Sequence, residues 1–482
     1  MKTIKLTLLC VMCGFTSFSQ TPELYKEIYN TYTSYKEDGF DQRRIKHSLV
    51  KERLGELASK ELFRLQQVGT SIEGRELFLL SVGTGDTQVF LWSQMHGDES
   101  TATRALFDIF NFLKSEDFQQ EKEKLFSNLT IHFLPMLNPD GAEKFQRRNA
   151  LGIDVNRDAL RLQSPEGKTL KRIRDSLEAD YGFNLHDQSK YYNTGRTGNP
   201  ATISFLAPAY DFEKSVNEVR GNAMKLIVEM NKLLQEHIPG QVGRYNDDFE
   251  PRAFGDNIQK WGTSTILIES GGYLDDPEKE EIRKLNYTMI LASLFALSEG
   301  DFLENEISLY EEIPENDRML FDLKIEGVTY ELLGNEYILD IGINRQEVDD
   351  EENLSFFYRS SETDRGDLST SYGYEEFNAE GYRVKIPLIY PQEVTMVEVE
   401  RLDFNSLLKD GYAFVRVIDL PEDKNFTEYP LHLISSDFEP RKEPGATFFL
   451  EKNGKIEFAV INGFLLDLSK EETDIENALI LK

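Results

Sequence analysis

The stretch "SQMHGDESTATRAL" (Ser93–Leu106) places a histidine, a glycine and two acidic residues directly before a segment of helical character. His96 and Glu99 stand three residues apart, a spacing that can offer an imidazole and a carboxylate to one metal ion. The same acids could instead cap a helix, because the exposed N–H groups at a helix N-terminus favour negative charge. Residues further along the chain decide between these two interpretations.

Short apolar runs around this stretch predict a buried sheet. The runs "ELFLLSVG" (76–83) and "QVFLWSQM" (88–95) indicate strands, and the Gly-Thr-Gly-Asp near their junction suits a hairpin turn. The continuous apolar run in "NLTIHFLPMLNPDG" (128–141) is typical of a strand buried on both faces. Helical patterns alternate with these runs at 102–115, 211–237 and 277–297. The alternation predicts an α/β domain with a mixed, mostly buried sheet that ends near residue 300.

The length and the charge distribution predict a second domain. A chain of 482 residues is long for a single core. Residues 301–482 hold 42 acidic and 17 basic residues, whereas residues 1–300 hold 43 and 37. Alternating apolar and polar residues after position 300 predict an acidic, β-rich accessory region of one or two lobes, following a domain at 20–300. The formal net charge of -31 argues against nucleic acid and anionic membranes as partners.

The N-terminus has the features of a secretory signal peptide. Residues 1–19 contain two lysines, an apolar run from Leu6 to Phe15 and a Ser-Phe-Ser cleavage site before Gln20. No later apolar run approaches membrane-spanning length. Both cysteines of the chain lie inside this peptide, so any metal in the mature chain must be held by His, Asp or Glu. We therefore expect a secreted or periplasmic protein without disulfides.

Polar residues that end later apolar runs favour the metal interpretation. His186 closes the run in "FNLHD", and Glu269 closes the run in "TILIESGG". Strand ends in open α/β sheets form ligand crevices, and a carboxylate there with no helix to cap needs a partner or a function. Together with His96 and Glu99, these side chains would converge on one edge of the sheet. That is the geometry a metal site requires.

These motifs, in this order, resemble those of the zinc carboxypeptidase family typified by pancreatic carboxypeptidase A (peptidase M14). The motifs are H-x-x-E at 96–99, N-P-D-G at 138–141, R-x-N and D-x-N-R within 147–157, the histidine at 186 and the glutamate at 269. The resemblance covers residues 65–300 and implies an eight-stranded mixed sheet flanked by helices. It also implies one zinc ion per chain and hydrolysis of the amide bond next to a free terminal carboxylate.

The resemblance implies a role for each catalytic residue. His96, Glu99 and His186 would bind zinc, and two imidazoles with one carboxylate leave a fourth position for water. Glu269 would be the general base that takes the water proton and passes it to the leaving amine. Arg147 would stabilise the oxyanion.

Other residues would bind the substrate. Asn156 and Arg157 would clamp its terminal carboxylate. Tyr245 would close over it, although the surrounding segment departs from the pancreatic pattern. Arg148 is the alternative to Arg147 as the oxyanion partner, whereas His132, inside a buried strand, is expected to be a packed core histidine.

Departures from the family pattern leave the substrate open between a peptide and a cell-wall peptide. Asp98 stands where the pancreatic enzymes have arginine, and His186 is followed by Asp187-Gln188 rather than Ser-Tyr. The tetrapeptide "HGDE" is similar to the murein-peptide amidases of the family, which cut the γ-D-glutamyl bond to a diamino acid. Asp256 would likewise favour a basic side chain.

Two alternatives lie outside this activity. One is an N-acyl amino acid deacylase related to aspartoacylase and succinylglutamate desuccinylase, which the N-P-D-G segment disfavours. The other is a non-catalytic binding protein that keeps the fold, which the intact Glu269 disfavours. The sequence leaves the oligomeric state open.

Overall fold

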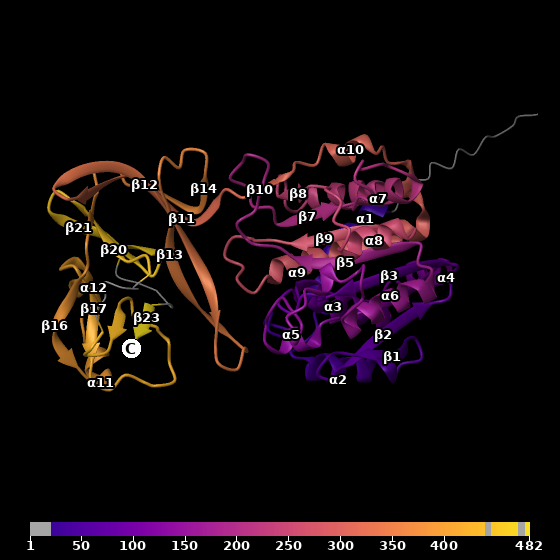
Figure 1. Ribbon diagram of the computed structural model, residues 1–482, viewed down its shortest axis with the longest axis horizontal. Helices are drawn as coiled ribbons and strands as arrows, with labels where there is room; N and C mark the ends of the chain where they lie inside the picture. Colours follow the sequence, from indigo (N-terminus) through magenta and orange to yellow (C-terminus); the bar gives the residue numbers. More distant parts are fainter. Residues whose placement is uncertain (1–20, 439–444, 471–477) are drawn as a thin grey trace, which may run out of the picture.

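The computed structural model describes residues 21–438, 445–470 and 478–482. The predicted signal peptide, residues 1–19, lies outside the described residues. Two parts lie side by side, a helix-flanked sheet on the right of Figure 1 and a β-rich region on the left. Within the described ranges, no helix is both long and apolar enough to cross a membrane.

An eight-stranded mixed sheet forms the centre of the first part, which confirms the predicted fold class. The four central strands run parallel to one another, and antiparallel pairings join the strands on either side of them. The strands in order across the sheet are β1 (Arg64–Thr70), β2 (Glu76–Gly83), β4 (Leu129–Leu134), β3 (Thr87–Ser93), β5 (Tyr181–Asp187), β9 (Ser264–Ser270), β7 (Ile203–Leu206) and β8 (Val242–Arg244).

Helices cover both faces of this sheet, and each face has its own apolar cluster. In β3, Leu91 packs on one face while Phe90 and Trp92 pack on the other. Helices of the first face are α1 (Thr21–Thr31), α2 (His47–Ala58), α3 (Thr101–Lys114), α4 (Gln119–Asn128), α7 (Glu218–Gln235) and α9 (Glu280–Glu299). Helices of the second are α6 (Pro165–Leu177) and α8 (Phe254–Lys260). Burial on both faces explains why the strands are continuous apolar runs.

Short helical segments complete this part of the chain. They are α5 (Pro139–Glu143), α10 (Ser308–Glu311) and the 3-10 turns η1 (Tyr32–Ser34), η2 (Val155–Arg157) and η3 (Asp301–Glu304).

The predicted hairpin between β2 and β3 is wrong, because β4 lies between these strands and pairs with both. The intervening glycines let the chain cross the start of β4. A Cβ atom on Gly83 would lie 2.2 Å from the carbonyl oxygen of Leu129, and one on Gly85 would lie 1.9 Å from the carbonyl carbon of Asn128. Glycine at these positions therefore marks a close backbone crossing rather than a hairpin turn.

The β-rich region contains two sheets, whose facing residues share an apolar cluster that includes Phe414 and Phe449. The first sheet contains β13 (Phe356–Gly366), β12 (Asn335–Asp349), β11 (Leu320–Leu332), β14 (Tyr372–Asn378), β15 (Arg383–Lys385), β20 (Phe448–Lys452), β21 (Lys455–Ile461) and β22 (Phe464–Asp467). The second contains β16 (Leu388–Val394), β17 (Tyr412–Val417), β19 (His432–Ile434), β23 (Ala478–Leu481) and β18 (Phe426–Thr427). Two short helices accompany them, α11 (Met396–Val399) and α12 (Phe404–Lys409).

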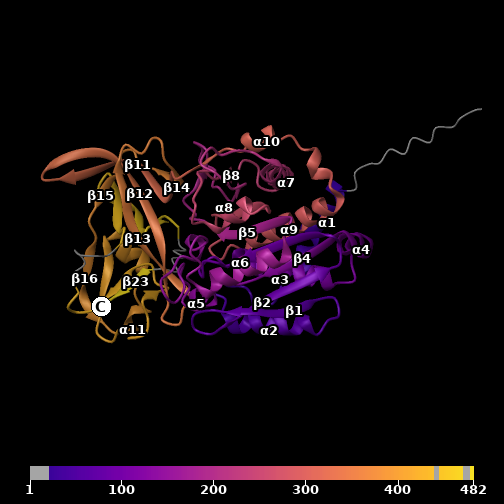
Figure 2. The same ribbon diagram turned by 45° about the vertical axis from the view of Figure 1, so that its right-hand side comes forward.

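A buried arginine joins the two parts. The side chain of Arg44 is 1% exposed and forms ion pairs with Glu347 and Asp349 of β12. Its guanidinium lies between two aromatic rings, 4.2 Å from the centroid of Phe145 and 4.4 Å from that of Phe356. Phe145 belongs to the first part and Phe356 to β13. The contact therefore fixes the β-rich region against the helix-flanked sheet. In Figure 2, α5 lies beside strands of the β-rich region.

The loop after β5 forms a second junction. Lys190 and Tyr191 both contact the Asp322 carboxylate of β11, each at 2.7 Å. The hydroxyl of Tyr374 in β14 donates to the carbonyl of Lys190 at 2.6 Å. A two-stranded sheet of β6 (Asn193–Thr194) and β10 (Asn316–Asp317) continues the contact. The β-rich region thus holds the loop that follows strand β5.

Candidate metal centre

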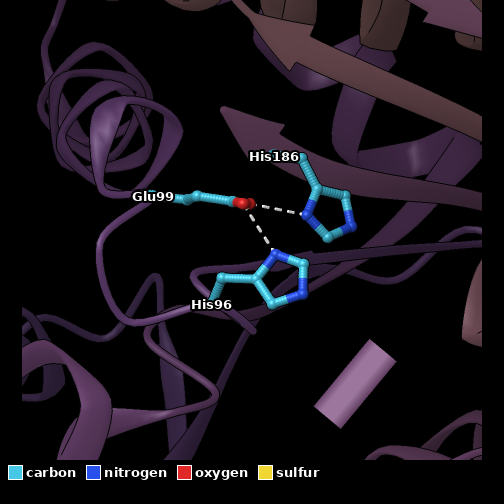
Figure 3. A group of neighbouring side chains, drawn as sticks. All are labelled: His96, Glu99 and His186. Atoms are coloured by element: carbon cyan, nitrogen blue, oxygen red, sulfur yellow. Dashed lines mark hydrogen bonds and ion pairs between the residues drawn. The ribbon is translucent and has the colours of Figure 1, made fainter. Parts of the chain in front are cut away.

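Three side chains of the predicted metal site converge where two parallel strands end. His96 follows β3, and His186 lies in the adjacent β5, with Ser93 opposite Leu185 in the register. Glu99 stands between His96 and the start of α3. The Nδ1 atom of each histidine lies 2.7 Å from an oxygen of Glu99 (Figure 3), His96 from Oε1 and His186 from Oε2.

The donor set fits a zinc ion. The three ligand atoms lie within 4.8 Å of one another, and all three residues are buried. Burial lowers the pKa of His96, but the Glu99 charge and a hydrogen bond to Asp154 outweigh burial and raise this pKa to about 9. Burial raises the pKa of Glu99, but the two imidazoles outweigh it and hold this pKa well below its usual range. Buried groups that face one another in this way need a shared cation or protons, and two imidazoles with one carboxylate are a ligand set of catalytic zinc.

Asp154 contacts His96, the first predicted ligand, a contact that the sequence reasoning missed. Its Oδ1 lies 3.1 Å from Nε2 of His96, so the Nδ1 lone pair of this ring faces Glu99. Burial raises the pKa of Asp154, but the hydrogen bond and charge of His96 outweigh burial and lower it. A carboxylate behind a metal-bound histidine fixes its tautomer and orientation. The D-x-N-R motif contained this signal, because Asp154 is its first residue.

Glu269 stands directly beside His186. Strands β5 and β9 are parallel, and their register places His186 opposite Glu269. The Oε2 atom of Glu269 is buried without a hydrogen-bond partner among the described residues. Burial, and then the charge of Glu99, raise the pKa of Glu269 well above its usual range. A buried carboxylate with a free oxygen and a raised pKa can accept and hold a proton.

Of the two adjacent arginines, Arg147 is the one at the ligands. Its Nη1 lies 3.1 Å from Glu99 Oε1 and 3.0 Å from His96 Nδ1, and its Nε donates to Asp154 at 3.1 Å. Arg148 instead donates to the carbonyl of Gly152 at 3.0 Å. The guanidinium of Arg147 can therefore place positive charge beside a reacting group at this centre.

Asn156 and Arg157 lie together in η2, next to the predicted metal ligands. The Nδ2 atom of Asn156 is 3.5 Å from His186 Nε2, and its Oδ1 accepts the backbone N–H of Phe254 at 3.0 Å. Arg157 donates to the Asn156 carbonyl at 2.9 Å, and its Nε lies 3.6 Å from a carboxylate oxygen of Glu250. With 37% of its side chain exposed, Arg157 is accessible to a second carboxylate.

Tyr245 and Asp256 occupy different positions relative to the ligands. Burial, and then the charge of Glu269, raise the pKa of Tyr245, whose ring centroid lies 5.6 Å from that of Tyr192. Asp256 sits in the first turn of α8 and accepts the backbone N–H of Glu250 at 2.9 Å. Tyr245 is therefore near the predicted base, whereas Asp256 shapes the loop that carries Glu250.

His132, expected as a core histidine, lies outside the cluster. Its Nδ1 is 2.7 Å from the Ser81 hydroxyl, and its Nε2 is 3.0 Å from the amide oxygen of Gln88. Burial lowers its pKa to about 4, so the ring is neutral near pH 7.

A cleft of about 730 Å³ opens beside Glu99, within the range of roughly 300 to 1,000 Å³ that is typical of ligand sites. Asp98 and Asp187 line it from the first part, and Arg345 and Tyr358 line it from the β-rich region. Burial, and then the charge of Glu99, raise the pKa of Asp98 to about 6. Strand alternation alone did not indicate that the accessory region would form a wall of the site.

The predicted metal ligands lie in a segment that matches a known protein family. Residues 52–195 match the family model described as zinc carboxypeptidase (peptidase M14). The chain is 25% identical to carboxypeptidase SOL1 of Arabidopsis thaliana over 182 residues, which cover 31% of this chain and 36% of that protein. It is 32% identical to carboxypeptidase E of Caenorhabditis elegans over 138 residues, or 24% and 29% of the two chains. The chain therefore spans about a third of the length of these curated relatives.

Alignments with solved structures cover about half of the chain. A metallo-carboxypeptidase from Burkholderia cenocepacia aligns with a TM-score of 0.43 and 19% identity, covering 52% of this chain and 68% of that one. Carboxypeptidase A from Helicoverpa armigera aligns with a TM-score of 0.42 and 16% identity, covering 58% and 81%.

The matched segment contains some of the predicted site residues and leaves others outside. His96, Glu99, Arg147 and His186 lie within residues 52–195. Glu269 and Tyr245 lie beyond it. The position of Glu269 in this site therefore rests on its register with His186.

Proposed function

We propose that this chain, which carries a zinc carboxypeptidase segment at residues 52–195, is a zinc metallopeptidase that removes a residue from a free C-terminus. One observation carries the proposal. Two histidine Nδ1 atoms meet the carboxylate of Glu99, and the partly unpaired carboxylate of Glu269 lies in register beside one of these histidines. A ligand set and an adjacent base are the two components that metal-assisted amide hydrolysis needs.

His96, Glu99 and His186 would hold zinc, which when bound polarises a carbonyl group and lowers the pKa of water. Glu269 would accept a proton from the attacking water and deliver it to the leaving amine, since its free oxygen is buried beside the ligands. Arg147 would place its guanidinium against the oxygen on which negative charge develops. Asp154 would keep His96 in the required tautomer.

Arg157 and Asn156 would bind the terminal carboxylate of the substrate. The contact between Arg157 and Glu250 is 3.6 Å long, and Glu250 is also engaged by Arg252 at 3.0 and 2.9 Å. A substrate carboxylate could therefore take the guanidinium of Arg157 without leaving Glu250 unpaired. Tyr245 would close over the substrate from the side of Glu269.

Comparison of free and amidated substrates tests this function. Loss of one partner from a charge pair costs roughly 2 to 5 kcal/mol, and the partial exposure of Arg157 favours the lower end. We expect C-terminal amidation to lower kcat/KM about thirtyfold. Arg157→Ala should abolish the difference. Arg148→Ala, which removes a guanidinium that contacts the Gly152 carbonyl instead, should preserve it. Equal cleavage of both peptides by the unaltered chain would instead indicate an endopeptidase or a deacylase.

The same assay addresses the substrate class. A murein tripeptide and N-acyl amino acids would be compared with ordinary peptides that end in Lys, Phe or Leu. The proposed signal peptide at residues 1–19 would bring the enzyme to the cell exterior or the periplasm, where either kind of peptide can be met. Preferential cleavage of the murein tripeptide would assign the chain to γ-D-glutamyl-diamino acid hydrolysis.

A further inference from the structure

The cleft beside Glu99 is lined, among the described residues, by neither Asn156 nor Arg157 of the proposed carboxylate clamp. Asp98 and Asp187, the neighbours of two metal ligands in the sequence, both line it. Among the described residues, neither Arg157 nor Tyr245 is part of its lining. If the clamp holds the terminal residue of a substrate, the cleft lies where the chain on the amino side of the scissile bond would run. This step rests on the function proposed above.

The β-rich region forms a fixed wall of this cleft. Tyr358 of β13 and Tyr374 of β14 line it, and Arg345 of β12 contributes a guanidinium. The hydroxyl of Tyr374 also donates to the carbonyl of Lys190. Nearby, Arg44 packs over the Phe145 ring and pairs with Glu347, which anchors β12. A wall held by buried charge and aromatic contacts gives the cleft a defined shape before a ligand arrives.

The charges within the cleft favour a cationic ligand. The basic side chains that line it already have acidic partners. Arg43 pairs with Glu347 at 2.5 Å, and Lys279 pairs with Asp187 at 3.2 Å. Asp98 has no ion-pair partner within the described part of the chain, and its Oδ1 is buried without a hydrogen bond there.

Asp187 adds a second acceptor for such a ligand. Only 6% of its side chain is exposed, and its Oδ2 is used by Lys279 and by the Thr101 hydroxyl. Its Oδ1 has no hydrogen-bond partner among the described residues. A buried carboxylate oxygen without a partner is costly, and an ammonium group would satisfy it.

We propose that this cleft is a subsite for an ammonium group on the amino side of the scissile bond, bound by Asp98 and Asp187 beneath the β-rich wall. The ligand would be a short peptide that presents either its free α-amino group or the side chain of a lysine. A peptide without a cation at this position would leave both acceptors unpaired.

Three tripeptides that share a C-terminal residue test the subsite. One has a free amino terminus, the second is N-acetylated, and the third is N-acetylated with lysine in first place. We expect the free-amine peptide to be cleaved with a kcat/KM at least tenfold above that of the acetylated one, the size of one charge-assisted hydrogen bond. Recovery of the rate by acetyl-lysine would assign the site to any ammonium group, and no recovery would assign it to the α-amino group.

Variants locate the effect. Asp98→Asn should bring the ratio between free and acetylated peptides toward one, with zinc content measured to verify the site. Asp275→Asn, at the exposed rim of the same cleft, removes an equal charge and should leave the ratio within about twofold, because exposed charges are screened. If both variants lose the preference for the free amine equally, the preference comes from the overall negative charge of the cleft and not from binding by Asp98.

The unaltered chain alone can overturn the proposal. Equal cleavage of free and acetylated peptides would refute the subsite while leaving the carboxypeptidase function in place. Failure of the zinc-loaded chain to cleave any of the three would refute the proposed function, and the subsite would fall with it.

Discussion

Individual strands of the two parts of the molecule differ in how far they are buried. In the helix-flanked sheet, β4 is buried at all six positions and β5 at all but its two ends, and the parallel strands bring their carboxyl ends to one edge. In the β-rich region, β14 has no buried position and β16 has one. The first arrangement concentrates polar side chains at strand ends, whereas the second presents long side chains along broad faces.

This difference assigns different contributions to the two parts. Groups that hold a metal and move protons must be fixed within fractions of an ångström, which a doubly covered sheet provides. Walls that only select a substrate tolerate a more exposed support. Substitutions in the helix-flanked sheet should therefore affect catalysis most, and substitutions where the β-rich region meets it should affect stability.

The largest effect is expected at Glu269. Glu269→Gln keeps the shape of the side chain but removes its capacity to accept a proton, so kcat should fall roughly a thousandfold or more while zinc remains bound. Turnover of a peptide substrate and elemental analysis measure the two quantities. Glu312→Gln, on an exposed residue, is the matched control. Activity within tenfold of the unaltered chain would mean that another group is the base.

Removal of a metal ligand should have the next largest effect. His186→Ala should weaken zinc binding at least about a hundredfold, because groups that merely hold a ligand in place already contribute tenfold to a hundredfold. Metal content after dialysis against a chelator checks this. His132→Gln alters another buried histidine outside the cluster and should keep its zinc. A full zinc complement in His186→Ala would remove this residue from the ligand set.

The sequence predicted the helix-flanked sheet well, for a physical reason. Strands buried on both faces are continuous apolar runs, and a histidine or glutamate that ends such a run is conspicuous. His186 and Glu269 were predicted in this way, and the register of β5 and β9 places them opposite each other. Strand β1 was missed because only Val68 of its residues is buried, so it has no apolar run.

Contacts between distant segments were beyond sequence reasoning. Arg43 and Glu347 are 304 positions apart and pair because two chain segments fold against each other. Asp154 was visible in its motif, but only the fold places its carboxylate at Nε2 of His96. The acidic composition after residue 300 likewise gave no sign that this region would line the cleft, since a solvated face has the same pattern.

A smaller effect is expected where the two parts meet. Arg44→Ala removes a buried guanidinium from Glu347 and Asp349, whose side chains are 25% and 31% exposed. Their partial solvation reduces the cost from the 3 to 5 kcal/mol typical of a fully buried pair to about 2 kcal/mol. Calorimetry should show the β-rich region unfolding at a lower temperature, with zinc content unchanged.

Arg53→Ala is the matched control for Arg44→Ala. It removes a guanidinium that is 25% exposed and pairs with Glu37 and with the exposed Glu56, and it should cost less than Arg44→Ala. An unchanged unfolding temperature in Arg44→Ala would show that apolar packing alone holds the two parts together.

The smallest effect concerns acid pH and Glu347. Burial would raise the pKa of this carboxyl, but the charges and hydrogen bonds of Arg43 and Arg44 outweigh burial and lower the pKa below its ordinary 4.5. A carboxylate with a depressed folded-state pKa contributes stability that is fully present above the unfolded pKa and lost as the pH falls through the folded one. Glu347→Gln should therefore lower the unfolding temperature at pH 7, by an amount equivalent to about 1 kcal/mol. The difference from the unaltered chain should shrink as the pH falls below about 4.5, whereas Glu351→Gln, at an exposed loop position, should leave the unfolding temperature unchanged at either pH. A difference that does not shrink as the pH falls below about 4.5 would show that Glu347 acts through packing rather than through its charge.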